Sequence, residues 1–107
     1  MGRDTLKVCA KRQGDMTEIK AITWLLANGF EVFRNESSTG PVDIVALDIE
    51  MDEVILIDVK TCAISVNTGN VTFSTNNKTE LQKDLAVQFL FYDKVDDIFT
   101  WEKDMFK

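Results

Sequence analysis

Three charged residues lie inside an otherwise apolar, strand-like stretch of sequence between Gly40 and Thr61. The stretch, GPVDIVALDIEMDEVILIDVKT, has two apolar runs around an acidic turn and predicts a hairpin of two buried strands. Asp43 lies in the first run, and Asp58 and Lys60 lie in the second. Because a buried charge is costly unless another group pairs with it, the fold must bring a compensating group to these residues. A bound cation is the leading candidate.

The register of this hairpin can be predicted from its acidic turn. We expect the turn within residues 48–53, where four acidic residues crowd together. A hairpin centred there sets Leu47 opposite Val54, and the same register sets Asp43 opposite Asp58. Directly opposed residues on antiparallel strands have Cβ atoms roughly 5 Å apart. Two carboxylates at that distance repel each other or share a proton, unless a divalent cation lies between them.

The three charged residues together suggest chemistry on a phosphate group. Hard cations such as Mg²⁺ bind one or two carboxylates together with waters and substrate phosphate. Lys60 shares a strand face with Asp58 and brings positive charge to the same place. This combination can activate a water and stabilise negative charge developing on a phosphate. The structural alternative is an edge-strand salt bridge between Asp58 and Lys60, with Asp43 merely opening its strand after Gly40-Pro41.

A fourth charged residue is predicted to face this region from a helix over residues 15–28, which Gly29 ends. The apolar face of this helix comprises Ala21, Ile22, Leu25 and Leu26. Glu18 lies on the same face, so the helix directs one carboxylate toward the protein against which it packs. The alternative is a capping box in which Asp15 is the N-cap and Glu18 reaches back to its amide.

These pieces, in this order, resemble the PD-(D/E)XK nuclease superfamily. They are Gly14-x-x-x-Glu18 on a first helix, Gly29 before an aromatic strand, Gly40-Pro41-Val42-Asp43, and Asp58-Val59-Lys60-Thr61. Within it, the chain is similar to small phage and cyanobacterial endonucleases that include intron-encoded homing enzymes, and to archaeal-type Holliday junction resolvases. The resemblance spans residues 11–101. It implies an α/β fold with a restriction-endonuclease-like core, in which helices flank a central mixed β-sheet.

The resemblance also implies roles for the four charged residues. Glu18, Asp43 and Asp58 would be metal ligands or orient the metal, and Lys60 would position or activate the water. The implied cofactor is Mg²⁺, with Mn²⁺ as a substitute, and the implied substrate is DNA. Two details depart from the pattern: Val42 separates Pro41 from Asp43, and Asp58 stands where resolvases usually have Glu. Because Asp is the shorter side chain, the second departure bears on the distance to a metal.

The net charge is the main objection to a DNA-binding function. The chain has 12 basic and 18 acidic residues and a net charge of −6, whereas DNA-binding modules are usually basic. The acid is concentrated in residues 48–53, in residues 93–97 and at the candidate site, where a metal would offset it. The N-terminal segment is basic, with Arg3, Lys7, Lys11, Arg12 and Lys20. We therefore expect weak, salt-sensitive DNA affinity from one subunit, and an active homodimer or larger homo-oligomer.

Six residues are candidates for DNA contacts. Basic charge or position near the site suggests Lys11, Arg12, Ser38, Thr39, Asn77 and Lys78. The competing interpretation of Ser38 and Thr39 is a Ser/Thr-rich turn that hydrogen-bonds its own backbone.

The absence of histidine excludes several classes of site. Without His, the chain has no Ser-His or Cys-His nucleophile and no His-ligated zinc. Its five glycines are isolated, so it has no glycine-rich phosphate loop. Two cysteines, Cys9 and Cys62, are expected to be free thiols in a reducing compartment. General-base chemistry then falls to a carboxylate, a lysine or a metal-bound water.

The remaining sequence predicts a scaffold for one domain over residues 1–107. We expect strands at residues 30–34 and 71–74, a helical turn at 79–84, and a closing hairpin of residues 86–92 with 98–101. The hairpin's apolar side chains are expected to form core or a subunit interface, and the hairpin is the expected subunit contact because it presents more aromatic surface than so small a chain readily buries. No apolar run approaches a membrane span and no signal peptide is recognisable, which predicts a cytoplasmic protein, in the host cytoplasm if it is phage-encoded.

The predicted function is therefore a Mg²⁺-dependent DNA endonuclease that hydrolyses phosphodiester bonds, of the site-specific (homing or restriction-like) type. Two alternatives remain open. The first is a structure-selective Holliday junction resolvase. The second is a catalytically inert nuclease-fold subunit that serves in binding, although such a subunit has no reason to keep four charged residues directed at one place.

Overall fold

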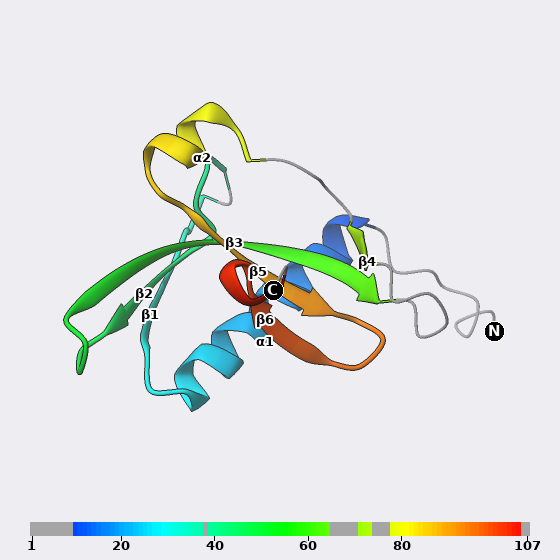
Figure 1. The fold of residues 1–107 in the computed structure, drawn as a ribbon, viewed down its shortest axis with the longest axis horizontal. Coiled ribbons are helices and arrows are strands. Elements are labelled where there is room, and N and C mark those ends of the chain that lie inside the picture. Colours follow the sequence, from blue (N-terminus) through cyan, green and yellow to red (C-terminus); the bar gives the residue numbers. More distant parts are fainter. Residues whose placement is uncertain (1–9, 38, 65–70, 74–77, 106–107) are drawn as a thin grey trace.

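The computed structural model describes residues 10–37, 39–64, 71–73 and 78–105. Along the chain it has α1 (Ala10–Ala27), β1 (Glu31–Arg34), β2 (Ile44–Asp48), β3 (Glu53–Ile64), β4 (Val71–Phe73), α2 (Glu80–Asp84), β5 (Gln88–Asp93), β6 (Ile98–Trp101) and α3 (Glu102–Met105) (Figure 1). The predicted strands and the predicted turn of helix before β5 are all present. No helix in these ranges is long and apolar enough to cross a membrane.

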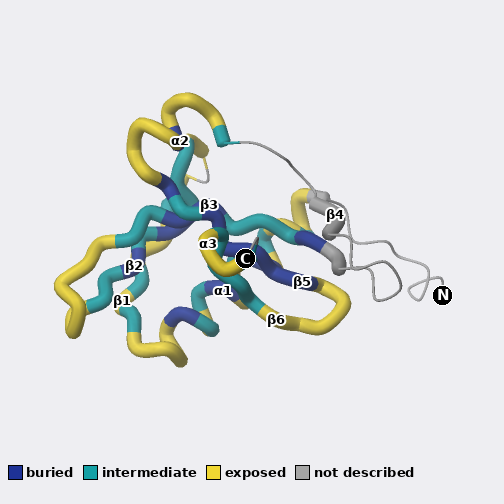
Figure 2. Tube along the Cα trace, viewed as in Figure 1, coloured by how far each residue is buried: buried dark blue, intermediate teal, exposed yellow. Residues whose placement is uncertain are grey.

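The strands form one mixed sheet in the order β1-β2-β3-β5-β6, with β4 paired to β3. The β3–β5 pair is parallel and the other pairs are antiparallel. Helix α1 packs on one face of the sheet, while α3 contacts β5 and β6. Figure 2 shows that the most buried parts of the chain gather where β3, β5 and α1 meet. The predicted central mixed sheet flanked by helices is confirmed.

The long central strand β3 has a gap along one of its edges. One edge pairs with β5 over residues 57–62. The other pairs with β2 over residues 53–57 and with β4 over residues 62–64. Residues 58–61 of β3 therefore lie where β2 has ended and β4 has not begun. Asp58 and Lys60, two of the charged residues identified in the sequence, lie in this stretch.

The register of the β2–β3 hairpin is as predicted. Leu47 pairs with Val54, and the ladder runs back to Ile44 opposite Ile57. Within the turn, Asp52 has a φ of 54°, a conformation that aspartate tolerates better than most residues. The hairpin can therefore close without glycine and still carry its apolar residues into the core.

Helix α1 differs from its predicted form in two respects. It begins at Ala10, before the predicted start, so Asp15 lies inside the helix and pairs with Lys11. The capping-box interpretation of Asp15 is therefore wrong. The buried face holds Ala21 and Leu25, whereas Leu26 is 57% exposed because it lies about 100° around the helix from Leu25.

The predicted helix end is confirmed. Gly29 has a φ of 89°, in the left-handed region where a helix commonly terminates. The amide of Phe30 bonds back to the Leu25 carbonyl at 3.1 Å. The chain thus turns directly from α1 into β1, whose neighbour β2 leads to the candidate site.

The β5–β6 hairpin is a core element. Val87, Phe89 and Phe91 are buried, and only 3% of Phe89 is exposed. Phe89 and Phe91 pack with Cys62, a free thiol, on the face of the sheet that Met105 covers. The expectation that this hairpin presents surplus aromatic surface to a second subunit is therefore wrong for Phe89. Two apolar side chains of the hairpin, Val95 and Ile98, are exposed.

Candidate active site

Asp43 marks the point where β2 separates from β3. Its backbone N–H donates to the Ile57 carbonyl at 2.8 Å, one step beyond the β2–β3 ladder. Its side-chain Oδ2 then accepts a hydrogen bond from the Val59 N–H at 2.9 Å. The carboxylate thus satisfies a β3 amide after β2 has ended, which fixes the side chain at the edge of the strand.

Asp58 lies beside Asp43 and is only 9% exposed. Its Oδ2 accepts a hydrogen bond from Nε2 of Gln82 at 2.7 Å and is 3.2 Å from Nζ of Lys60. The Lys60 ammonium also lies 5.2 Å from the centroid of the Phe89 ring. The Asp58–Lys60 ion pair that the sequence suggested is therefore present, but β3 is a central strand and the edge-strand interpretation of that pair is wrong.

The carboxyl groups of Asp43 and Asp58 lie close enough to form a hydrogen bond when one of them is protonated. Burial, followed by the hydrogen bond with Asp58, raises the pKa of Asp43 from its ordinary 3.8 to about 7. The negative charges of Asp58 and Glu18 act in the same direction, and the hydrogen bond from the Val59 amide opposes them. Near neutral pH the pair therefore tends to hold a proton between two groups that would otherwise repel. The hairpin register predicted this juxtaposition.

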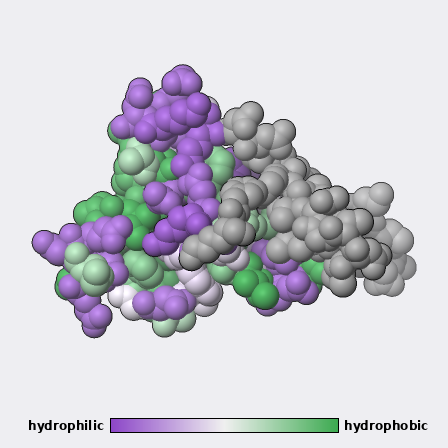
Figure 3. All heavy atoms as spheres, viewed as in Figure 1, coloured by the Kyte–Doolittle hydropathy of each residue, from purple (hydrophilic) through white to green (hydrophobic). Residues whose placement is uncertain are grey.

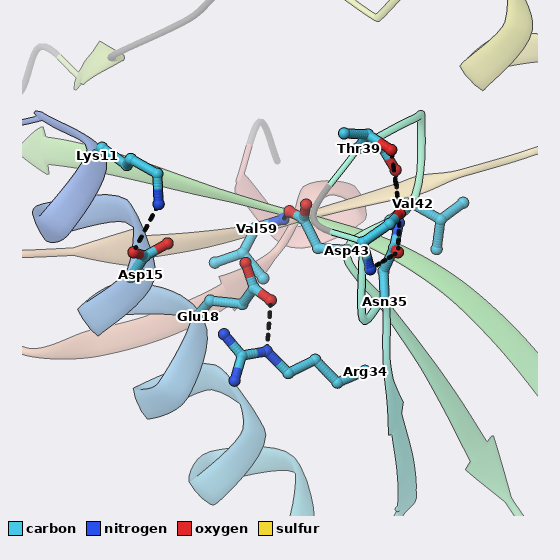
Figure 4. A network of polar contacts seen from close by, with 10 residues as sticks. Lys11, Asp15, Glu18, Arg34, Asn35, Thr39, Val42, Asp43 and Val59 are labelled. Carbon is cyan, nitrogen blue, oxygen red and sulfur yellow. Dashed lines mark hydrogen bonds and ion pairs between the residues drawn. The ribbon is translucent and has the colours of Figure 1, made fainter.

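Glu18 approaches the pair from α1. Figure 4 shows its side chain pointing from the helix toward Asp43 and Val59. Its Oε1 lies 3.2 Å from Nε of Arg34, and its side chain is largely buried. One residue earlier, the Thr17 hydroxyl is 3.2 Å from that of Thr61, which anchors this turn of α1 to β3. The helix thus directs Glu18 at the candidate site, as its sequence position predicted.

The predicted ligand set is assembled only in part. In the ranges that the structure describes, no group of three or more His, Cys, Asp or Glu side chains is close enough to hold a metal ion. Asp43 and Asp58 are in contact, while Glu18 is engaged by Arg34 and interacts with Asp43 through its charge. A pair of carboxylates that takes up a proton at neutral pH nevertheless fits a hard cation, since a cation removes the repulsion that raises the pKa.

Sequence reasoning missed two residues at this site. Gln82 comes from α2, where only a helical turn was expected, although Thr79-x-x-Gln82 is a recognisable capping-box pattern. Arg34 ends β1 and binds Glu18, and nothing in the local sequence marks it as a partner. Both contacts join segments that are far apart in the chain, so local patterns could reveal the helix start but not its target.

The predicted DNA contacts are spread over several elements. Lys11 is exposed and pairs with Asp15 on the same side of α1 as Glu18, about two turns earlier (Figure 4), and Arg12 beside it is also exposed. Lys78 binds Glu102 at 2.6 Å and lies 5.3 Å from the centroid of the Phe89 ring, which Lys60 also contacts. Ser38 and Asn77 lie outside the described residues.

Thr39 belongs to a hydrogen-bonded loop. Its hydroxyl lies 3.0 Å from that of Ser37, and its carbonyl accepts from Nδ2 of Asn35 at 2.6 Å. The same Asn35 amide donates to the Val42 carbonyl at 2.8 Å (Figure 4). These bonds support the turn interpretation of this loop, and Asn35 fixes the segment that delivers Asp43 to the site.

Comparison with known proteins agrees with the fold. The mixed sheet with its flanking helices is of the restriction-endonuclease-like class. A family model described as PD-(D/E)XK endonuclease matches residues 8–105. The chain therefore belongs to the PD-(D/E)XK endonuclease family, as the resemblance of its motifs predicted.

One solved structure shares the fold. It is titled "The structure of a bacterial homing endonuclease: I-Ssp6803I", and it superposes with a TM-score of 0.64 at 21% sequence identity. The match covers 89% of this chain and 65% of that chain, so this chain spans less than two thirds of the length of the homing endonuclease. A search of curated proteins gave no match.

Proposed function

We propose that this protein is a divalent-metal-dependent DNA endonuclease that hydrolyses phosphodiester bonds, with Mg²⁺ as its cofactor and Mn²⁺ as a substitute. The observation that carries the proposal is the pair of a partly buried Asp43, whose pKa is raised to about 7, and a buried Asp58 with the Lys60 ammonium against it. The fold shared with a homing endonuclease favours the site-specific type of activity.

The residues at and around Asp43 and Asp58 would have different roles in such a site. Asp43 and Asp58 would hold the metal, and Glu18 would contribute the third carboxylate from α1. A bound Mg²⁺ would supply a lowered pKa for a coordinated water and positive charge beside the phosphate. Lys60, held near Asp58 and Phe89, would orient the attacking water and stabilise negative charge on the phosphate. The Val59 amide and Gln82 keep the two aspartates in place.

The net charge of the chain bears on how it binds DNA and on the assembly that would be active. A net charge of −6 makes DNA binding by one subunit dependent on the metal and on low salt. We therefore propose a homodimer or larger assembly as the active form, since two active sites allow both strands to be cut in one binding event. Val95 and Ile98 at the β5–β6 end are the exposed apolar side chains of that hairpin that a partner subunit would cover.

Sedimentation at micromolar concentration tests the assembly. We expect a dimer or larger species, and Ile98→Glu is expected to shift it toward monomer. Phe89→Glu is not a suitable probe, because Phe89 is core and its replacement would unfold the chain. A strict monomer that makes double-strand breaks in one binding event would refute the proposed assembly.

A cleavage assay on three substrates tests the activity. Supercoiled plasmid, linear duplex and a four-way junction are incubated with Mg²⁺, with Mn²⁺ and with a chelator. Discrete fragments from linear duplex would establish the site-specific type, and symmetric nicks confined to the junction would establish a resolvase. Absence of metal-dependent cleavage on all three would overturn the proposed nuclease function and favour a binding subunit.

A further inference from the structure

Gln82 is a buried polar side chain that contacts β3 and the segment leading into β2 at the candidate site. It is 7% exposed, and its Nε2 donates to Oδ2 of Asp58 at 2.7 Å and to the Pro41 carbonyl at 3.0 Å. Pro41 lies in the segment that leads into Asp43. One amide group therefore joins α2 to the carboxylate on β3 and to the chain that carries the other carboxylate.

The same side chain closes the capping box of α2, but that task uses only its oxygen. Oε1 of Gln82 accepts from the Thr79 N–H at 3.0 Å, and the Thr79 hydroxyl accepts from the Gln82 N–H at 3.1 Å. Glutamate in this position forms the same box, because the box needs an acceptor and not a donor. The amide nitrogen is thus required by Asp58 and Pro41 rather than by the helix.

The position of the amide also sets the orientation of Asp58. Gln82 and Lys60 both reach Oδ2 of this carboxylate. The amide donor is neutral and its oxygen is held by the Thr79 backbone N–H, whereas the ammonium sits on a long, flexible side chain. Gln82 is therefore the more rigid of the two side chains that bind Asp58. Figure 3 shows that the outer surface over α2 is mainly hydrophilic, so the helix places Gln82 inward while its remaining surface faces solvent.

We propose that Gln82 is a positioning residue, which fixes Asp58 and the Pro41–Asp43 segment relative to each other so that the two carboxylates can hold one cation. The inference rests on the proposed nuclease function. Partners that orient metal ligands typically contribute about 10–100-fold to metal affinity or activity. Gln82 then supports the active site, although it does not touch the substrate.

The test compares Gln82→Met with Thr79→Ala. Methionine keeps the volume of the side chain and removes both donors, whereas Thr79→Ala weakens the helix cap and leaves the bonds from Nε2 in place. Three quantities are measured on each folded variant: the Mg²⁺ concentration that gives half of the thermal stabilisation in the absence of DNA, and kcat and KM for DNA cleavage. We expect Gln82→Met to raise the first about tenfold and to lower kcat about tenfold or more with KM unchanged. Thr79→Ala is expected to change neither.

A second variant covers the case in which Gln82→Met does not fold. Gln82→Glu retains the capping box but replaces both amide donors with an acceptor that repels Asp58, so it is expected to lose kcat about tenfold or more. Wild-type kcat and Mg²⁺ dependence in either folded variant, or an equal loss in Thr79→Ala, would overturn the proposal. A wild-type protein that cuts no DNA would instead refute the proposed function, which separates the two failures.

Discussion

Two polar clusters of this protein use the same kinds of side chain with opposite electrostatic results. At the far end of β5 from the site, Lys20 donates to the Tyr92 hydroxyl at 3.0 Å, and that hydroxyl donates to Asp97 at 2.6 Å. The hydrogen bond from Tyr92, followed by the charge of Lys20, lowers the pKa of Asp97. The hydrogen bond to Tyr92 and the charge of Asp97 raise the pKa of Lys20. Each charge in this cluster has a partner of opposite sign.

The candidate site is arranged differently. There, burial and two neighbouring carboxylates raise the pKa of Asp43 to about 7, although Lys60 lies against Asp58. The cluster of Lys20, Tyr92 and Asp97 satisfies itself and ties α1 to the β5–β6 hairpin. The site retains repulsion that only a proton or a cation removes. This difference distinguishes a charge network that stabilises the fold from one that is suited to binding a ligand.

The largest expected effect is on the rate of DNA cleavage, which substitutions in the candidate site should lower and a substitution in the Lys20–Tyr92–Asp97 cluster should not. Asp43→Asn, Asp58→Asn and Lys60→Met each remove a charge from the site with little change in volume, and each is expected to lower the cleavage rate at least about a hundredfold. Asp97→Asn is the matched control: asparagine tolerates the φ of 58° at this position, and cleavage is expected to stay near wild type. Plasmid-cleavage rates, with circular dichroism to confirm folding, measure the contrast. A site variant that cuts at the wild-type rate would show that the assigned site is wrong.

The next effect concerns stabilisation by metal. Millimolar Mg²⁺ or Mn²⁺ should raise the melting temperature, because a ligand that binds only the folded state adds stability, about 2.7 kcal/mol at a hundred times its Kd. Asp43→Asn is expected to abolish this shift, whereas Asp97→Asn should preserve it. Thermal melts with and without metal provide the comparison, repeated with DNA in case the phosphate is a required ligand. A wild-type melt that metal leaves unchanged even with DNA bound would argue against the metal site.

A smaller effect is expected in the pH dependence of stability without metal. The folded pKa of Asp43 is raised above its ordinary 3.8 to about 7, so between these values the folded state binds more protons than the unfolded state. Stability contributed by this residue is therefore lost as pH rises through about 7. Asp43→Asn should melt higher than wild type at pH 8, and this advantage should disappear near pH 4. An advantage of the same size at both pH values would contradict the shared proton.

The smallest effect is expected at Asp97, where the sign is reversed. The pKa of Asp97 is lowered on folding, so its contribution is present above its unfolded pKa and is lost as pH falls through the folded value. Asp97→Asn should therefore melt slightly lower than wild type at neutral pH and equally in strong acid. The change should be small because the group is exposed and solvent screens it. Thermal melts of Asp97→Asn across the same pH series test this opposite sign. A melting temperature above that of wild type at neutral pH would contradict it.

The sequence predicted those features of the site that depend on neighbouring residues. Alternation along the strands and the acidic turn were enough to set Leu47 opposite Val54, and hence Asp43 beside Asp58. In the same way, the position of Glu18 on its helix predicted that its side chain points toward the site. These relations follow from backbone geometry, which is the same in any well-formed hairpin or helix.

The missed features depend on how distant segments pack. Gln82 reaches Asp58 only because α2 returns to β3 before β5 begins, and Arg34 reaches Glu18 only because β1 lies beside α1. Leu26 was placed on the buried face because its position on the helix was close to that of the core residues, but the sheet covers a narrower strip of α1 than the apolar pattern suggested. The aromatic residues of β5 fill the core beside Cys62, where their number alone had suggested an interface.

A proton shared by Asp43 and Asp58 where a cation would bind is tested most directly by an NMR titration of the Asp43 carboxyl carbon in metal-free protein. We predict a midpoint near pH 7, and a shift of that midpoint to lower pH when Mg²⁺ is added, because the cation replaces the proton. A midpoint close to the ordinary 3.8 that does not respond to Mg²⁺ would contradict the account.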